Sequence, residues 1–158
     1  MLSGLLSAEA YILVASSSYL PAHVASHFDA DGFANGFMAR ADYQLLMMGL
    51  GLGIPVVLVL GLVVLPYYMP NRLRIPSRDY WIEPGRRNET LNTIMTSGLT
   101  MGCIVTAFMI AVHLLVVEAN NRVPPQLDNT SFYTLIALLI MSIVIWQFIL
   151  WRRFQVPR

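Results

Sequence analysis

The sequence contains very little charge and no lysine. Only 12% of its 158 residues are charged, whereas 56% are hydrophobic. A soluble domain carries about 25% charged residues, so this balance argues against a water-soluble fold. The ten basic residues are all arginine, and with nine acidic residues they leave a net charge of +1. A balance so close to neutral excludes nucleic-acid binding through a basic face.

Cysteine is almost absent as well. The single cysteine, Cys103, lies within an apolar segment. One cysteine cannot form an intrachain disulfide or a cluster of cysteine metal ligands. The sequence also shows no repeats and no low-complexity stretch, so we expect one membrane domain over residues 1–158.

The apolar residues are concentrated in four blocks. About 20 residues of helix cross the ~30 Å hydrocarbon core of a bilayer, and an isolated segment there must be helical because its backbone groups have no other partners. The sequence therefore predicts an all-α, polytopic membrane protein with four transmembrane helices. The predicted spans are residues 2–20, 45–69, 93–117 and 132–151.

The first block also admits a second interpretation. It contains one charged residue, Glu9, and it is followed by Ala22 and Ala25, whose spacing resembles a signal-peptide cleavage site. A cleaved signal peptide is therefore the alternative to a span. The block lacks the basic n-region of such a peptide, so we expect a span.

Arginine positions predict the orientation of the chain. Eight of the ten arginines lie in the segment between the second and third blocks or in the C-terminal tail. Because cytoplasmic loops are enriched in basic residues, both termini are expected on the cytoplasmic side. The two remaining loops carry only Arg40 and Arg122 and are expected to face outward. Aromatic residues near the inner ends of the spans agree with this orientation; they are Tyr67, Tyr68, Tyr80, Trp81, Trp146 and Trp151.

Two pairs of glycines four residues apart lie within the predicted spans, Gly49 with Gly53 and Gly98 with Gly102. Small residues at this spacing allow helices to approach closely. We expect them to serve packing within the bundle.

The first loop carries the residues most suggestive of a site. His23 and His27 would share one face of a helix and could hold a metal, although the zinc-peptidase pattern needs a Glu where Val24 stands. Asp29 and Asp31 resemble the start of a calcium loop, but the downstream acidic ligand is absent.

A structural interpretation of the same loop needs no ligand. His27, Asp29 and Asp31 would hydrogen-bond the backbone of a turn, while Gly32 and Gly36 would supply positive φ angles. Structure, metal binding and ligand recognition therefore all remain open for this loop.

Ionisable residues within or near the spans form a second group of candidates. His113 and Glu118 fall near the outer end of the third span, where they could join His27 in an outer cluster that holds a metal. Alternatively, His113 is neutral and hydrogen-bonded to a neighbouring helix. Glu9 is expected near mid-depth, where an acid is either paired or part of a proton path.

The segment between the second and third spans is rich in arginine and aromatic residues. Such residues suit anionic lipid headgroups, and docking of a cytoplasmic partner is the alternative. The candidates for lipid or partner contact are Arg72, Arg74, Arg78, Tyr80, Trp81, Arg86 and Arg87.

Two segments resemble a bacterial membrane-protein family of unassigned function, whose domain also forms the N-terminal part of SdpI-type immunity proteins. The first segment contains Leu20-Pro21, His27-Phe28, Gly32 and Asn35-Gly36, and the second runs from Ile75 to Thr90. Ala25 stands where family members often have proline. The resemblance implies a bacterial inner-membrane protein with the His-Phe loop outside the cytoplasm. It also implies that Pro21, Phe28, Gly32, Asn35 and Gly36 shape a turn.

Together these features favour a non-enzymatic accessory or interaction subunit of a membrane complex, with a sensor or immunity role suggested by the resemblance. The expected partners are the lipid bilayer and other membrane-protein subunits, and no cofactor is predicted. The alternative is a small transporter or metal-binding membrane enzyme that uses the outer His/carboxylate cluster.

Overall fold

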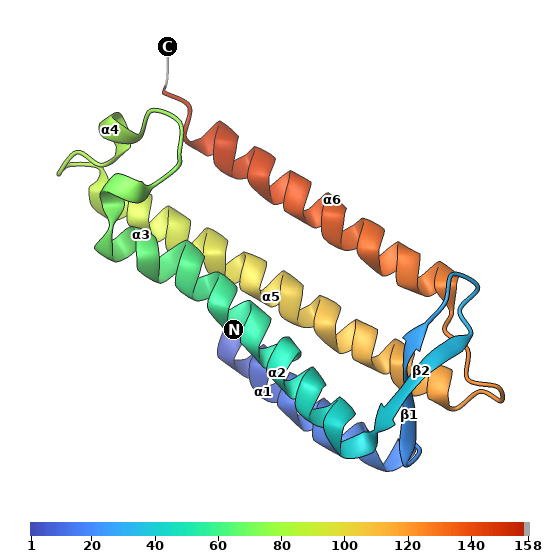
Figure 1. Ribbon diagram of the computed structural model, residues 1–158. Helices are drawn as coiled ribbons and strands as arrows, with labels where there is room; N and C mark the ends of the chain where they lie inside the picture. Colours follow the sequence, from blue (N-terminus) through green and yellow to red (C-terminus); the bar gives the residue numbers. More distant parts are fainter. Residues whose placement is uncertain (157–158) are drawn as a thin grey trace.

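The computed structural model describes residues 1–156, which form a bundle of helices with a small β-hairpin at one end (Figure 1). The arginine-rich segment and the C-terminal end of α6 lie together at the opposite end of the bundle. We call these the hairpin end and the arginine end. In chain order the elements are α1 (Leu2–Ala15), η1 (Ser16–Tyr19), β1 (His23–Phe28), β2 (Ala34–Ala39), α2 (Arg40–Val59), η2 (Leu60–Val64), α3 (Leu65–Tyr68), η3 (Pro70–Arg72), α4 (Arg78–Trp81), α5 (Arg87–Asn120) and α6 (Asn129–Arg153).

Within residues 1–156, three helices are long and apolar enough to cross a membrane. They are the continuous segment Arg40–Tyr68, α5 and α6, with 29, 34 and 25 residues. Each exceeds the about 20 residues that a span requires. The prediction of long apolar helices is confirmed for the second, third and fourth blocks.

The first block is different, because α1 has only 14 residues and continues as a 3₁₀ turn of four. Leu2 packs beside Gly102, where a Cβ would lie 3.3 Å from Leu2 Cδ2. Gly102 lies about 22 Å along α5 from Arg87, at 1.5 Å per residue. The helix α1 therefore covers the half of α5 nearest the hairpin, and a complete fourth span is not confirmed.

The all-α prediction is wrong at the first loop, which forms a two-stranded antiparallel sheet. Val24 pairs with Met38 and His27 with Gly36, and the register shifts on either side of His27. In β1 the adjacent residues Val24 and Ala25 are both completely buried. Val24 belongs to a hydrophobic core beneath the hairpin, which consists of Leu13, Leu20, Val24, Tyr43 and Met47.

Helix α2 buries one face against this core. Tyr43, Met47, Gly51 and Pro55 follow one another at intervals of four residues, so their side chains share a face. After this face the helix widens into the π-helical turn η2. Pro66 explains the widening, because its ring would collide with the carbonyl of Leu62, four residues earlier.

The glycine pairs have two different environments. A Cβ on Gly98 would lie 2.7 Å from Val63 Cγ2, and one on Gly102 would lie 2.6 Å from Val59 Cγ2. Only glycine allows this approach of α5 to the second span, so packing within the bundle is confirmed for this pair. Gly49 and Gly53 have nothing within 4 Å of a Cβ, so they face open space.

The last helix, α6, is the least enclosed element. It packs along α5, and the Trp146 indole donates a 3.0 Å hydrogen bond to Ser97 O. All residues of α6 are described, and none is buried. Figure 1 shows it standing apart from α1 and α2, with α5 between them.

Candidate functional site

His113 is the centre of a polar cluster at the hairpin end of the bundle. It is 1% exposed, and both ring nitrogens face hydroxyl groups. Ser16 Oγ lies 2.7 Å from Nε2, and the Tyr43 hydroxyl lies 3.0 Å from Nδ1. The Tyr43 and His113 rings also stack, with centroids 5.8 Å apart. We call these three residues the His113 cluster.

One arrangement of protons satisfies every member of this cluster. Ser16 Oγ donates to Leu13 O at 3.4 Å, so its lone pairs are free to accept from Nε2–H of His113. Nδ1 then accepts from the Tyr43 hydroxyl. In the opposite tautomer Nδ1–H would donate to Tyr43, whose own proton would have no acceptor among the described residues. A neutral His113 hydrogen-bonded to neighbouring helices is therefore what the geometry supports.

Glu9 lies in α1, about two helical turns before Ser16. Glu9 is only 2% exposed, because the other helices of the bundle cover it. Its Oε1 lies against Gly51, where any Cβ would overlap the carboxyl oxygen. Oε2 has no hydrogen-bond partner among the described residues. Glu9 thus faces the bundle interior, as membrane acids usually do, but its polar end is incompletely bonded.

The tip of the hairpin follows the structural interpretation in part. Asp29 Oδ1 accepts hydrogen bonds from the backbone of Asp31 at 3.0 Å and Phe33 at 2.9 Å. Gly32 has a φ of +84°. Both features were predicted from the sequence. They close the turn between β1 and β2.

Other predictions for this loop are wrong. His23 and His27 lie in a strand rather than on a helix. The His27 ring lies 3.1 Å from Ser26 Oγ rather than bonding the turn backbone. Gly36 lies in β2, where its lack of a side chain leaves room for His27: a Cβ there would be 3.0 Å from His27 Cβ. Close approach, not a positive φ, explains that glycine.

The remaining turn residues, Pro21, Phe28 and Asn35, flank or lie within the strands. The Pro21 carbonyl accepts from Arg40 Nε at 3.2 Å, which ties the start of β1 to the start of α2. Phe28 and His27 line a cavity of about 450 Å³ between the hairpin and the ends of α5 and α6. Asn35 is exposed in β2.

Asn120 holds the hairpin on the bundle, a role that the sequence analysis missed. Its side-chain oxygen accepts from Ala25 N at 2.8 Å, and its amide donates to Ala25 O at 3.0 Å. The amide thereby replaces a third strand beside β1. Asn at the end of an apolar helix was the available signal, but its partner could not be identified without the fold.

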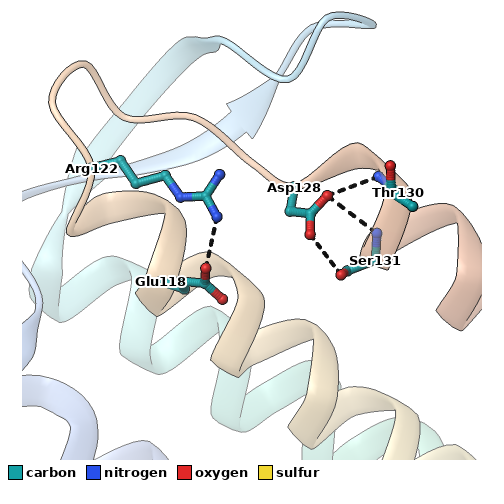
Figure 2. Close-up of polar contacts among 5 residues, drawn as sticks. All are labelled: Glu118, Arg122, Asp128, Thr130 and Ser131. Carbon is teal, nitrogen blue, oxygen red and sulfur yellow. Dashed lines mark hydrogen bonds and ion pairs between the residues drawn. The ribbon is translucent and has the colours of Figure 1, made fainter.

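Residues 121–128 complete the hairpin end. Phe33 pairs with Gln126 in an isolated bridge, and Leu127 N donates to Gly32 O at 2.8 Å. Figure 2 shows two carboxylates beside this loop: Glu118 pairs with Arg122 at 2.7 Å, and Asp128 accepts from Thr130 and Ser131. Glu118 is therefore occupied by an exposed ion pair.

The predicted outer cluster of His27, His113 and Glu118 is not assembled. Each residue has different neighbours, given above, and no group of three or more His, Cys, Asp or Glu in residues 1–156 could hold a metal ion. Asp29 and Asp31 likewise belong to no group of this kind among the described residues.

At the arginine end, Trp81 is buried and connects the arginine-rich segment to the residue that follows α6. Its indole donates a 2.8 Å hydrogen bond to Phe154 O, and the two rings meet edge to face at 5.6 Å. Trp81 O accepts from Thr90 at 2.9 Å. Of the residues expected to contact lipid or a partner, Trp81 is therefore part of the local core.

The arginines of this segment differ in their partners. Arg78 pairs with Asp79, and Arg86 pairs with Glu83 while lying 3.7 Å above the Tyr80 ring. Arg153 pairs with Glu89. By contrast Arg72, Arg74 and Arg87 are exposed and have no ion pair within residues 1–156.

Two grooves flank α6. One, of about 800 Å³, lies between α5 and α6, and its α5 side includes three threonines and a serine; we call it the threonine groove. The other, of about 460 Å³, lies between α6, α5 and the η2–α3 segment; we call it the arginine-end cavity. The threonine groove contains Glu89, Asn92, Thr93, Thr96, Ser97, Thr100, Trp146, Ile149, Leu150 and Arg153.

No protein-family model, curated protein or solved structure matches this chain in sequence or fold comparisons.

Proposed function

We propose that the protein is a non-enzymatic accessory subunit of a membrane complex, and that it binds a transmembrane helix of another chain along the threonine groove. The observation that carries this proposal is the exposure of α6. A 25-residue apolar helix with no buried residue leaves most of its surface available for other contacts.

The chemistry of the groove supports helix binding. In lipid, helices associate through close packing of small residues and through polar contacts rather than through the hydrophobic effect. Thr93 and Thr100 donate their hydroxyls to the carbonyls four residues earlier, both at 2.9 Å. Two of the four small hydroxyl side chains of the groove are thus bonded within α5, while Thr96 and Ser97 offer hydroxyls for polar contacts with a neighbouring helix.

We also propose the orientation predicted by the arginines for the arginine end, which would lie in the cytoplasm. Because Leu2 lies beside Gly102, we propose α1 as a fourth membrane-embedded segment along the hairpin half of α5, in place of the predicted complete span that begins in the cytoplasm. The resemblance described above supports a bacterial inner membrane and a sensor or immunity role. A hairpin outside the cytoplasm, held by Asn120 directly to the end of α5, is a surface at which an external signal could act.

The helix-binding proposal is tested by native mass spectrometry after extraction in mild detergent. The wild-type chain should co-purify with a partner, and Thr100→Phe should abolish this by filling the groove. Val57→Phe is the control, because Val57 is also exposed in a membrane helix but lines neither groove. If both variants retained the partner, or the wild-type chain were a bare monomer, the proposal would be wrong.

A small transporter is the second candidate function, favoured by one observation: the buried, incompletely bonded Glu9. Such a carboxyl in a membrane domain can bind and release a proton. In proteoliposomes the wild-type protein would then carry protons and Glu9→Gln would not. Equal flux in both would exclude this function.

A further inference from the structure

The arginine-end cavity combines an apolar wall with unpaired positive charge. Gly61, Leu62 and Leu65 line one side, and Ile94 and Leu150 line another. Arg72 and Arg74 lie at its arginine-end margin, on the turn that follows α3. The cavity thus extends from a charged rim into the part of the bundle formed by apolar helices.

Among the arginines of this end, Arg72 and Arg74 are the two that line the cavity. Neighbouring Arg78, Arg86 and Arg153 have carboxylate partners within the chain, whereas Arg72 and Arg74 have no ion pair within residues 1–156. Their guanidinium groups carry planar arrays of donors that match phosphate oxygens. An anion is therefore the ligand that their chemistry selects.

The size of the cavity decides between a lipid and a helix. A volume of about 460 Å³ is typical of a small-molecule site. A helix about 10 Å across would fill it in roughly one turn. A flexible acyl chain fits a narrow apolar space that a helix cannot enter.

We propose that the arginine-end cavity binds one anionic phospholipid, with its phosphate held by Arg72 and Arg74 and an acyl chain lying along Gly61, Leu65 and Leu150. Basic pockets between transmembrane helices bind anionic headgroups in this way. The site is separate from the threonine groove and does not depend on a partner helix.

The charge requirement is tested with the full chain in nanodiscs of phosphatidylcholine, alone or mixed with phosphatidylglycerol, followed by native mass spectrometry. One phosphatidylglycerol should remain bound per chain. The double variant Arg72→Gln/Arg74→Gln should weaken retention at least about tenfold, because two charge-assisted contacts are lost. The control Arg87→Gln/Arg152→Gln removes the same charge away from the cavity and should retain the lipid.

The shape requirement is tested with Gly61→Leu, which fills the apolar wall and leaves both arginines in place. A Cβ at Gly61 meets nothing within 4 Å, and the same holds at Gly49, so Gly49→Leu is a control of equal bulk on the same span. Only Gly61→Leu should lose the lipid.

Three results would overturn the proposal. They are equal retention of phosphatidylcholine and phosphatidylglycerol, equal loss in the two arginine double variants, and displacement of the lipid by inorganic phosphate with Gly61→Leu binding as wild type. The last result would show a simple anion site.

Discussion

Three buried polar side chains are accommodated differently within this apolar bundle. His113 has both nitrogens bonded and Asn120 has its amide fully engaged, whereas Glu9 has an unpartnered oxygen. An unsatisfied buried polar group costs free energy that a bonded one does not. Bonded groups of this kind fix the arrangement of α1, α2 and α5, while Glu9 stands out as a residue retained despite its cost.

Removing the Tyr43 hydroxyl should destabilise the protein. In Tyr43→Phe, His113 Nδ1 loses its donor in a buried site, at a cost of roughly 1–3 kcal/mol in the free energy of unfolding. Thermal unfolding in detergent measures this. The control is Tyr67→Phe, since Tyr67 is exposed and its hydroxyl has no partner among the described residues. Similar melting temperatures for the two variants would show that the hydrogen bond between Tyr43 and His113 does not stabilise the protein.

The contact between Glu9 and Gly51 gives a second residue-scale prediction. Gly51→Ala should destabilise the bundle by about 1–3 kcal/mol, as overpacking does, because its Cβ would overlap Glu9 Oε1. The double variant Glu9→Ala/Gly51→Ala should lose most of this penalty. Gly53→Ala, with open space around it, should unfold like wild type. If the change in unfolding free energy of the double variant equalled the sum of the two single changes, the two residues would not interact.

Elements differed in how well the sequence predicted them. Uninterrupted apolar runs predicted the three long helices, because no other backbone arrangement suits lipid. The hairpin was missed, although Asp31-Gly32 between apolar segments is a hairpin signal. The strands exist because Asn120 and residues 121–128 supply hydrogen-bond partners from about 95 residues away, and no local pattern contains that information.

The start of α6 depends on Asp128. Its carboxylate accepts hydrogen bonds from Thr130 N and from both the backbone and hydroxyl of Ser131. Bonding to the Ser131 hydroxyl, with the backbone amides and nearby Arg122 adding to it, lowers the pKa of Asp128 despite a small opposing desolvation. The folded-state pKa is therefore below the unfolded one. Stability from this cap is present above the unfolded pKa, about 3.9, and is lost as pH falls through the folded value.

Asp128→Ala should therefore lower the melting temperature at neutral pH by a few degrees at most, and the difference from wild type should shrink in acid. Asp128→Asn is the control, since Asn caps helices about as well as Asp but does not titrate. A pH series of melting curves for the three proteins checks this. If Asp128→Ala melted below wild type by the same amount at acid and neutral pH, the charge of the cap would contribute nothing to stability.

At the scale of the whole molecule, three helices that are long and apolar enough to cross a membrane, α2–α3, α5 and α6, pack side by side, and α1 lies on the hairpin half of α5. Its candidate residues are separated along the bundle: Glu9 and the His113 cluster lie inside, the hairpin caps one end, and unpaired arginines lie at the other. The sequence predicted which residues were polar and at which end they lay. It could not predict that His113 bonds Ser16 and Tyr43, because those contacts join residues 97 and 70 positions apart.

The central claim is that the hairpin and the arginine end lie on opposite sides of the membrane, with the arginine end in the cytoplasm. Single cysteines test it directly: Ala30→Cys and Gly85→Cys, each in a Cys103→Ser background, treated in intact cells with a membrane-impermeant maleimide. The account predicts labelling at position 30 at once and at position 85 only after permeabilisation. Labelling of position 85 but not position 30 in intact cells would contradict it.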